Sequence, residues 1–240
     1  PERPFSSRKL VECLREGAQK FGWAQRNPKP GQVREGQWQI GLGVASALRN
    51  SPTLASAARV RIDKKGHITV ETDMTDIGTG SYTVLAQTAA EMMGVPLHQV
   101  TVKLAESHYP QSCGSGGQFG GNSSTSGVYA ACVLLRSKLA QQAGWDPVAT
   151  TFENGKMSSA GQSKSLAEAA GPKGLSAEDK IDFGDSQKKW AQASFGAHFV
   201  EVAVHRVSGE TRVRRALGVF AAGRILNPKT ARSQLLGAMA

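Results

Sequence analysis

The sequence lacks the features that define several large classes of protein. Its longest apolar runs, such as residues 217–222, are far shorter than the roughly 20 residues of a membrane-spanning helix, so we expect no membrane span. The N-terminal residues show no apolar signal core and no lipidation motif. The three cysteines have spacings that fit neither a zinc site nor an iron–sulfur cluster, and the five histidines form no HxH or HxxxH pair. We therefore expect neither a disulfide scaffold nor a metal held by protein side chains.

The motifs of ordinary hydrolytic catalysis are also missing. Ser112 and Ser115 lie near His108 in the sequence, but no Gly-x-Ser-x-Gly elbow follows a strand there. Cys113 has no evident base beside it, and such a cysteine is more often a small inert residue. No pair of carboxylates stands out as an acid and a base. We assign no catalytic residue.

The composition is that of a globular and basic chain. Of its 240 residues, 40% are apolar and 20% are charged, which disfavours wholesale disorder. The 29 Lys and Arg against 19 Asp and Glu give a net charge of +10, which favours an anionic partner such as nucleic acid, an acidic protein or a phosphate-bearing ligand. The basic residues are scattered and no nucleic-acid-binding motif is present, so nucleic acid is not expected.

Apolar periodicity and turn residues predict helices and strands of the α+β class, arranged as a two-layer mixed β-sheet with helices on one face. They are, in chain order, a helix capped by Ser6 or Ser7 that runs to Phe21, a buried strand over 38–48, a hairpin of 57–62 and 67–72, a helix over 82–93 that Gly94 ends, a strand over 100–104, a helix from Val128 to Leu139, a second hairpin of 199–207 and 211–220, and a helix that opens at Asn227 and Pro228.

Weak periodicity divides the chain into three parts. Residues 146–194 are rich in Gly, Ser, Lys and Pro and predict an irregular connection between a first part, 1–145, and a last part, 195–240. The sequence starts without methionine, and the last predicted helix reaches Ala240 without a capping residue. We therefore expect the chain to be a piece of a longer polypeptide.

A first candidate binding segment covers 76–83, where Gly78 and Gly80 stand between a strand and a helix. Free backbone N–H groups and the helix dipole at such a point favour an anion. Thr83 stands where a dinucleotide fingerprint has its third glycine, so that motif is incomplete, and a plain tight turn explains the glycines equally well.

Two further segments are rich in glycine or in positively charged residues. Residues 112–127 contain six glycines, which form either a flexible surface loop or a concave backbone surface that a flat polar ligand approaches closely. In 222–234, Asn227 suits a helix cap beside Arg224, Lys229 and Arg232, so this helix start favours a phosphate, although a plain capped helix with solvated cations fits too. We expect the glycine-lined backbone and this basic helix start to bind one extended anionic ligand.

The three segments, in this order and separation, resemble the molybdenum-cofactor-binding subunit of the xanthine dehydrogenase and aldehyde oxidase family, most of all the large subunits of bacterial periplasmic aldehyde oxidoreductases. The stretches that carry the resemblance are 75–83, 114–121 with 128–132, and 196–202 with 223–228. The resemblance implies that the two main parts of the chain belong to the molybdenum-cofactor-binding region and that the ligand is molybdopterin cytosine dinucleotide. Its metal is held by the pterin dithiolene.

The resemblance also assigns residues. It places Ile77, Gly78 and Thr79 against the pterin, where many relatives have glutamine in place of Thr79, and Gly120 and Gly121 against the cofactor. The residues that it assigns to the dinucleotide part are Arg224, Ile225, Leu226, Asn227, Pro228, Lys229, Thr230 and Gln234. The family's catalytic glutamate stands in a Gly-Glu motif that this sequence ends before reaching.

Function and partners follow from the same resemblance. It implies part of a heterotrimeric molybdenum enzyme that oxidises aldehydes to carboxylic acids with water-derived oxygen, beside an iron–sulfur subunit and an FAD subunit. The isolated 240 residues are expected to be inactive. The resemblance implies the periplasm, with the cytoplasm left open. The alternatives are a non-enzymatic basic α+β module that binds an acidic protein or nucleic acid, and a structural remnant of such an enzyme.

Overall fold

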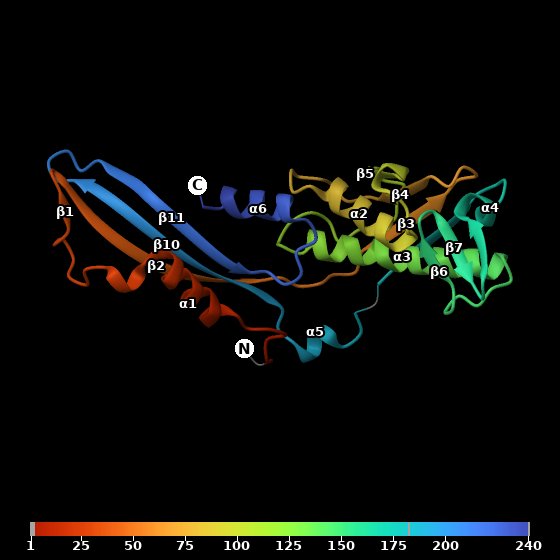
Figure 1. Cartoon of the computed structure of the whole chain (residues 1–240), viewed down its shortest axis with the longest axis horizontal. Coiled ribbons are helices and arrows are strands. Elements are labelled where there is room, and N and C mark those ends of the chain that lie inside the picture. The colour runs from red at the N-terminus through yellow and green to blue at the C-terminus, as the bar shows by residue number, and fades with distance from the viewer. Residues whose placement is uncertain (1–2, 182, 240) are drawn as a thin grey trace. The chain divides into compact units, whose positions relative to one another are not determined.

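The chain contains two compact units, one of them inserted into the other in sequence. The structure, a computed structural model, describes residues 3–181 and 183–239 (Figure 1). Unit 1 combines Pro1–Ser51 with Lys188–Ala240, and unit 2 is Pro52–Gln187. Each unit has its own four-stranded sheet and its own buried cluster.

Unit 1 is built on an antiparallel four-stranded sheet in the order β1-β2-β10-β11. Its strands are β1 (Arg34–Glu35), β2 (Trp38–Asn50), β10 (Ala193–His205) and β11 (Thr211–Ala221). Strands β2 and β10 pair without a register shift from Trp38↔His205 to Asn50↔Ala193. The predicted second hairpin is confirmed as β10 and β11, with a register shift between Glu201 and Val202.

Helix α1 (Leu10–Phe21) packs on β10 and β11 and forms the small core of unit 1. Buried Cys13 and Phe21 contact Phe199 and its neighbours on β10. A Cβ at Gly17 would lie 2.2 Å from the Phe199 ring, so a glycine is required for this close approach. The helix begins after Lys9, which makes no side-chain cap, so the predicted cap at Ser6 or Ser7 is wrong. The short 3-10 helix η1 (Trp23–Gln25) follows.

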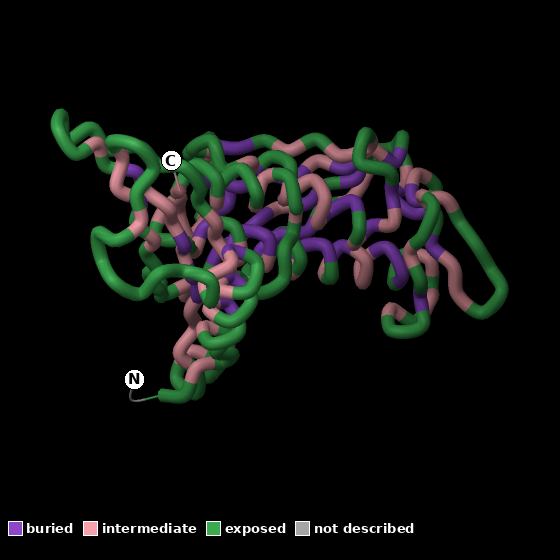
Figure 2. The backbone as a smooth tube through the Cα atoms, turned by 60° about the vertical axis from the view of Figure 1, so that its left-hand side comes forward, coloured by how far each residue is buried: buried purple, intermediate pink, exposed green. Residues whose placement is uncertain are grey.

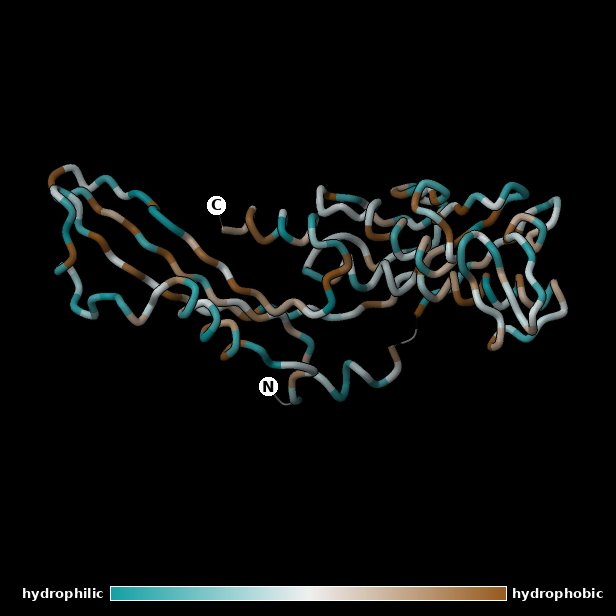
Figure 3. Tube along the Cα trace, viewed as in Figure 1, coloured by the Kyte–Doolittle hydropathy of each residue, from teal (hydrophilic) through white to brown (hydrophobic). Residues whose placement is uncertain are grey.

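Strand β2 is present as predicted, but it is largely exposed rather than buried. From Gly43 to Asn50 every residue is exposed, and the side chains are mostly small. Hydrophobic residues recur along β2, β10 and β11 (Figure 3), so apolar composition alone does not distinguish the covered strands from the uncovered one. Burial depends on which strands α1 covers, and α1 lies over β10 and β11.

Unit 2 is built on a mixed sheet in the order β5-β4-β3-β9. Strands β3 (Ala57–Ile62) and β4 (Ile68–Thr72) form the predicted hairpin, β5 (Val100–Leu104) runs parallel to β4, and β9 (Leu175–Lys180) is antiparallel to β3. Helices α2 (Ser81–Met93) and α3 (Gly120–Gln142) pack against this sheet. The α+β class with mixed sheets and helices is thereby confirmed.

The core of unit 2 lies between this sheet and its helices. Leu85 and Met93 of α2, Leu135 of α3, and Val60 and Val70 of the sheet are fully buried, and burial follows the regular elements while the turns are exposed (Figure 2). The end of α2 at Gly94 is confirmed, since this glycine adopts a left-handed conformation that caps the helix. The 3-10 helix η2 (Leu97–Gln99) then leads into β5.

Two stretches are more regular than the sequence predicts. Helix α3 begins at Gly120, so the expected loop ends there and not at Gly127. Residues 146–194 contain a third sheet, β6-β7-β8, and short helices. The elements of this stretch are β6 (Thr151–Glu153), β7 (Lys156–Ser159), β8 (Gln162–Ser165), α4 (Leu166–Ala170), β9 and α5 (Ser186–Lys189). How the cofactor-binding region divides at 145 and 195 stays a prediction.

Unit 1 ends in the predicted helix, α6 (Pro228–Gly237), with Asn227 as its N-cap. Ala238 follows as the C-cap residue. The expectation that this helix runs uncapped to Ala240 concerns a residue outside the described ranges.

Candidate functional site

The turn between β4 and α2 is organised around one carboxylate. Asp76 Oδ1 accepts hydrogen bonds from the backbone N–H groups of Gly78 (2.9 Å), Thr79 (3.1 Å) and Gly80 (3.3 Å). Asp76 Oδ2 accepts a longer one, 3.4 Å, from Tyr82 N–H. The anion expected at this helix start is therefore the protein's own aspartate, because it occupies the N–H groups that an outside anion would need.

The outer surface of this turn is open. Ile77 is 61% exposed, so its side chain is available for contact. Gly78 has φ of +94°, and a Cβ placed there would meet nothing within 4 Å. The turn thus presents bare backbone and one apolar side chain to its surroundings.

The glycine-rich loop that precedes α3 is hydrogen-bonded to the end of the unit 2 sheet from which the 76–82 turn leaves. Asp73 Oδ1 accepts a 2.7 Å hydrogen bond from Ser112 N–H, and the buried Ser56 hydroxyl accepts one of 3.3 Å from Cys113 N–H. The Ser115 hydroxyl donates to the carbonyl of Thr75. This loop is therefore held in place, and it lies directly beside the 76–82 turn.

The start of α3 lies against both loops. A Cβ at Gly120 would lie 3.2 Å from Met74 Cε and 3.4 Å from Gly114 O, so a side chain there would crowd the packing. Gly121 is exposed, and a Cβ there would meet nothing within 4 Å. The structure therefore brings together the first two predicted groups, Ile77 to Thr79 and Gly120 with Gly121.

The third predicted group lies in unit 1, around the start of α6. Asn227 Oδ1 accepts hydrogen bonds from the N–H groups of Lys229 (2.9 Å) and Thr230 (3.0 Å), and Pro228 occupies the first turn, so the predicted cap is confirmed. The cap uses N–H groups that were expected to point outward. The positions that remain exposed here are Arg224, Ile225, Leu226, Pro228, Lys229, Arg232 and Gln234. That this group shares one ligand with the other two stays a prediction.

Side-chain chemistry elsewhere gives no competing centre in the described ranges. Within them no group of three His, Cys, Asp or Glu is arranged to hold a metal ion. Burial raises the pKa of the Cys132 thiol to about 12, which keeps it protonated and unreactive. Two shallow depressions occur in unit 2, one beside Lys64 and Glu168 and one beside Glu91 and Glu153, and neither includes a predicted residue.

No helix in the described part of the chain combines the length and apolar character that crossing a membrane requires.

Three residues that shape the two loops were given no role from the sequence. Asp73, Asp76 and Ser56 hold the turn and the glycine-rich loop; Asp73 and Ser56 lie outside the predicted segments, and Asp76 lies in the 76–83 segment but was given no role. An Asp two residues before a glycine is typical of a turn in which the carboxylate accepts the following N–H groups, so Asp76 carried a signal. No sequence signal indicated the role of Ser56, because its hydrogen-bond partner Cys113 is 57 positions away in the sequence.

Comparison with curated proteins finds relatives named as an oxidoreductase subunit and an oxidase. The chain is 59% identical over 239 residues to the aldehyde oxidoreductase molybdenum-binding subunit PaoC of Escherichia coli strain K12, covering 100% of this chain and 33% of that protein. It is 29% identical over 260 residues to the probable hypoxanthine oxidase XdhD of the same strain, covering 95% and 25%. The chain thus spans about a third of the first of these relatives and a quarter of the second.

Solved structures share the fold. Quinoline 2-oxidoreductase from Pseudomonas putida 86 matches with a TM-score of 0.78 at 23% identity, over 99% of this chain and 34% of that one. Carbon monoxide dehydrogenase from Oligotropha carboxidovorans matches with a TM-score of 0.81 at 17% identity, over 97% and 33%.

The family model for the molybdopterin cofactor-binding domain matches residues 16–240, which is nearly the whole chain and includes all three predicted segments. The resemblance stated from the motifs is confirmed: the chain belongs to the molybdopterin cofactor-binding domain family.

Proposed function

We propose that this chain forms part of the molybdenum-binding subunit of an aldehyde oxidoreductase and binds molybdopterin cytosine dinucleotide. The observation that carries the proposal is the 59% identity to an aldehyde oxidoreductase subunit over the whole chain. Proteins this similar share their fold and, in most positions, the groups that face a ligand. Aldehydes are the substrate class, and the reaction yields the carboxylic acid with oxygen from water.

The residues of unit 2 suit a flat polar group. Gly78 and Gly121 leave open space where a side chain would otherwise stand, so planar rings can approach the backbone closely. The Asp76 carboxylate accepts the N–H groups of this turn, so they point toward it, and it places a negative charge beside them. This arrangement favours the pterin ring system over a phosphate, and we assign Ile77, Gly78, Thr79, Gly120 and Gly121 to the pterin.

The residues of unit 1 suit the phosphate-bearing part. Arg224, Lys229 and Arg232 bring three cations to the segment before α6 and its first turns. Guanidinium and ammonium groups that lie close together in the sequence are suited to charge-assisted hydrogen bonds with a pyrophosphate. Exposed Ile225 and Leu226 offer an apolar surface to a base or ribose. We assign the dinucleotide to Arg224, Ile225, Leu226, Asn227, Pro228, Lys229, Thr230 and Gln234.

When bound, the molybdenum cofactor supplies the redox chemistry that converts the aldehyde to the acid. This chain's own residues bind and orient it: the unit 2 glycines admit the pterin, and the unit 1 cations neutralise phosphate charge. Electrons leave through an iron–sulfur subunit and an FAD subunit in a heterotrimer, and the 240 residues alone are inactive. A periplasmic location rests on the resemblance, and cell fractionation decides between periplasm and cytoplasm.

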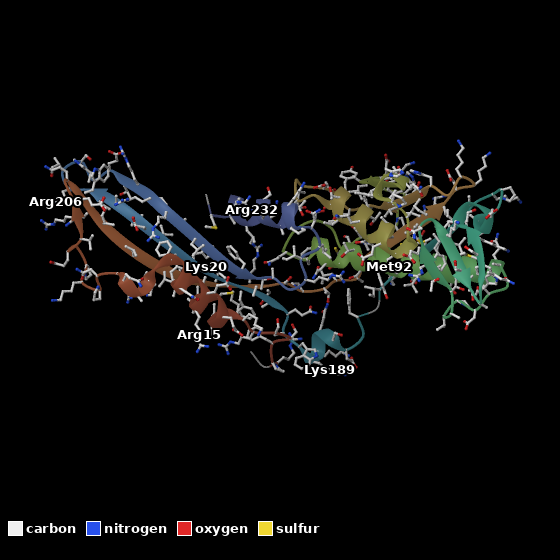
Figure 4. All side chains as sticks on the ribbon, in the orientation of Figure 1. Arg15, Lys20, Met92, Lys189, Arg206 and Arg232 are labelled. Carbon is white, nitrogen blue, oxygen red and sulfur yellow. The ribbon has the colours of Figure 1, made fainter. Side chains whose placement is uncertain are left out.

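The test is a double substitution in the complete subunit that contains this chain. Arg224→Ala with Lys229→Ala removes two charges from the segment, and we expect bound molybdenum and released cytidine nucleotide to fall together by at least about tenfold. The matched control, Arg206→Ala with Lys20→Ala, removes the same charge from the β10–β11 hairpin and from α1, at sites apart from α6 (Figure 4).

The readouts separate the parts of the proposal. Unchanged molybdenum and cytidine content in the double variant would contradict the dinucleotide role of the 222–234 segment. Aldehyde oxidation that persists in the isolated 240 residues, with cofactor and an electron acceptor added, would contradict the expected inactivity. The relatives do not favour the alternative of a basic module that binds nucleic acid. That alternative predicts that the protein binds random DNA in a salt-sensitive way and contains no cofactor.

A further inference from the structure

Strand β2 presents a long unpaired edge. Within residues 3–181 and 183–239, the only strand on its outer side is β1, which pairs with Trp38 and Gln39 alone. Beyond Ile40, whose N–H donates to Val33, the strand continues for ten residues to Asn50 with β10 on one side only. An unpaired edge of this length exposes a row of backbone donors and acceptors.

The register shows which amides face outward. Ile40 N–H points to the β1 side, whereas the Gln37 carbonyl and the Ser51 N–H bond to the β10 side. Because β2 and β10 pair without a shift, this alternation holds along the strand. The amides of Leu42, Val44, Ser46 and Leu48 therefore face the open edge, and those of Gly43, Ala45 and Ala47 face β10.

The side chains along this edge lack the usual protection. The eight residues from Gly41 to Leu48 contain no charge and no proline, only Gly, Ala, Val, Leu and Ser. The other edge of the same sheet, β11, carries Arg212, Arg214 and Arg215, which is how natural edges avoid pairing. The contrast within one sheet marks the β2 edge as a surface made for pairing.

The exposed side chains also indicate what kind of strand fits. Val44 pairs with Phe199 and Leu48 with Phe195, so both lie on the face that α1 covers farther along the sheet. They are 42% and 51% exposed, beyond the reach of that helix. The opposite face carries Gly43, Ala45 and Ala47, which leave room for bulky neighbours. A strand with apolar side chains at alternate positions would cover both faces.

We infer that the β2 edge from Gly41 to Leu48 is completed by an added strand from the same polypeptide, from a part of it outside these 240 residues. The chain matches only 33% of the length of PaoC and 34% of the quinoline 2-oxidoreductase chain, so such relatives hold ample further sequence. A second copy is disfavoured, because each copy carries a net charge of +10. Backbone pairing supplies the affinity, and Val44 and Leu48 select the apolar positions.

The first test measures amide hydrogen exchange at single-residue level in the complete purified protein. The inward amides of Gly43, Ala45 and Ala47 serve as the internal control. We expect the outward amides of Leu42, Val44, Ser46 and Leu48 to exchange at rates within about tenfold of the rates of the inward amides. Faster exchange of the outward set than this overturns the proposal. Protection that disappears on dilution identifies a second copy as the occupant and also overturns it.

The second test uses proline at adjacent positions. In a free edge, Ser46→Pro is tolerated because the lost N–H faces solvent, whereas Ala45→Pro breaks the ladder with β10. With an added strand in place, we expect both variants to lower the melting temperature of the complete protein to a similar extent. A Ser46→Pro variant as stable as the wild type overturns the proposal. If neither variant folds, the exchange measurement on the unaltered protein decides.

Discussion

The most informative perturbation removes the carboxylate that organises the turn between β4 and α2. Asp76→Ala deletes the acceptor of four backbone N–H groups, two at 2.9 and 3.1 Å and two longer at 3.3 and 3.4 Å. Each ordinary bond is worth about 1 kcal/mol and the aspartate also favours the start of α2, so the loss is about 2 to 3 kcal/mol. Asp76→Asn keeps an acceptor without the charge and should lose about half as much.

This perturbation should affect the cofactor as well as stability. Once the N–H groups of Gly78 and Thr79 are released, the turn no longer holds one conformation, and the surface assigned to the pterin is lost. In the complete subunit we expect a melting temperature several degrees lower together with reduced bound molybdenum and pterin. Fluorescence of the released pterin and elemental analysis measure the cofactor, and thermal denaturation measures stability.

A matched control distinguishes these effects. Asp63 organises the β3–β4 turn in the same way, by accepting from the N–H groups of Lys65 (2.8 Å) and His67 (3.0 Å). Asp63→Ala should lower stability and leave the molybdenum content per folded protein unchanged. If Asp76→Ala keeps wild-type molybdenum content and melting temperature, or if it behaves like Asp63→Ala, the reasoning about the turn is refuted.

Further predictions concern the packing and titration of α3. Gly127→Ala places a Cβ 2.2 Å from the Ser56 carbonyl oxygen and should destabilise the protein by about 1 to 3 kcal/mol in denaturant unfolding. Gly121→Ala has open space around it, so it should leave stability unchanged and reduce only the cofactor content. An equally stable Gly127→Ala variant would show that α3 does not pack this closely. Cys132 has a folded-state pKa raised by burial from 9.0 to about 12, so its contribution to stability is complete below pH 9 and is lost as the pH rises toward 12. Cys132→Ala should therefore flatten the alkaline decline of the unfolding free energy, and an unchanged slope would contradict the burial of the thiol.

The local parts of this fold were predictable from the sequence. The β3–β4 hairpin, the stop of α2 at Gly94 and the cap of α6 at Asn227 each depend on residues within a few positions of one another. Turn and cap chemistry is short-range, so periodicity and a few turn residues are enough to place these elements.

The parts that could not be predicted depend on distant partners. Helix α3 begins seven residues before Gly127 although its first turns consist of glycine, asparagine, serine and threonine. It packs closely on Ser56 at Gly127, a partner that lies far away in the sequence. Composition alone predicts a loop there. The exposure of β2 likewise follows from which strands α1 covers, and no pattern within β2 records that.

The candidate site was predictable only in part. Its glycines and cations were visible as motifs, and the resemblance gave them roles. The role of Asp76 as the resident anion was not assigned, because a favourable helix start predicts negative charge without saying where that charge comes from.

The insertion of unit 2 between β2 and β10 has a consequence for biosynthesis. A ribosome completes β2, then all of Pro52–Gln187, before the strand that pairs with it emerges. At about 5 to 20 residues per second this interval lasts roughly 7 to 27 s, long enough for unit 2 to fold first. The uncharged 41–48 segment of β2 stays unpaired in the nascent chain throughout, so translation pauses or chaperone supply in that interval should govern the yield of folded protein.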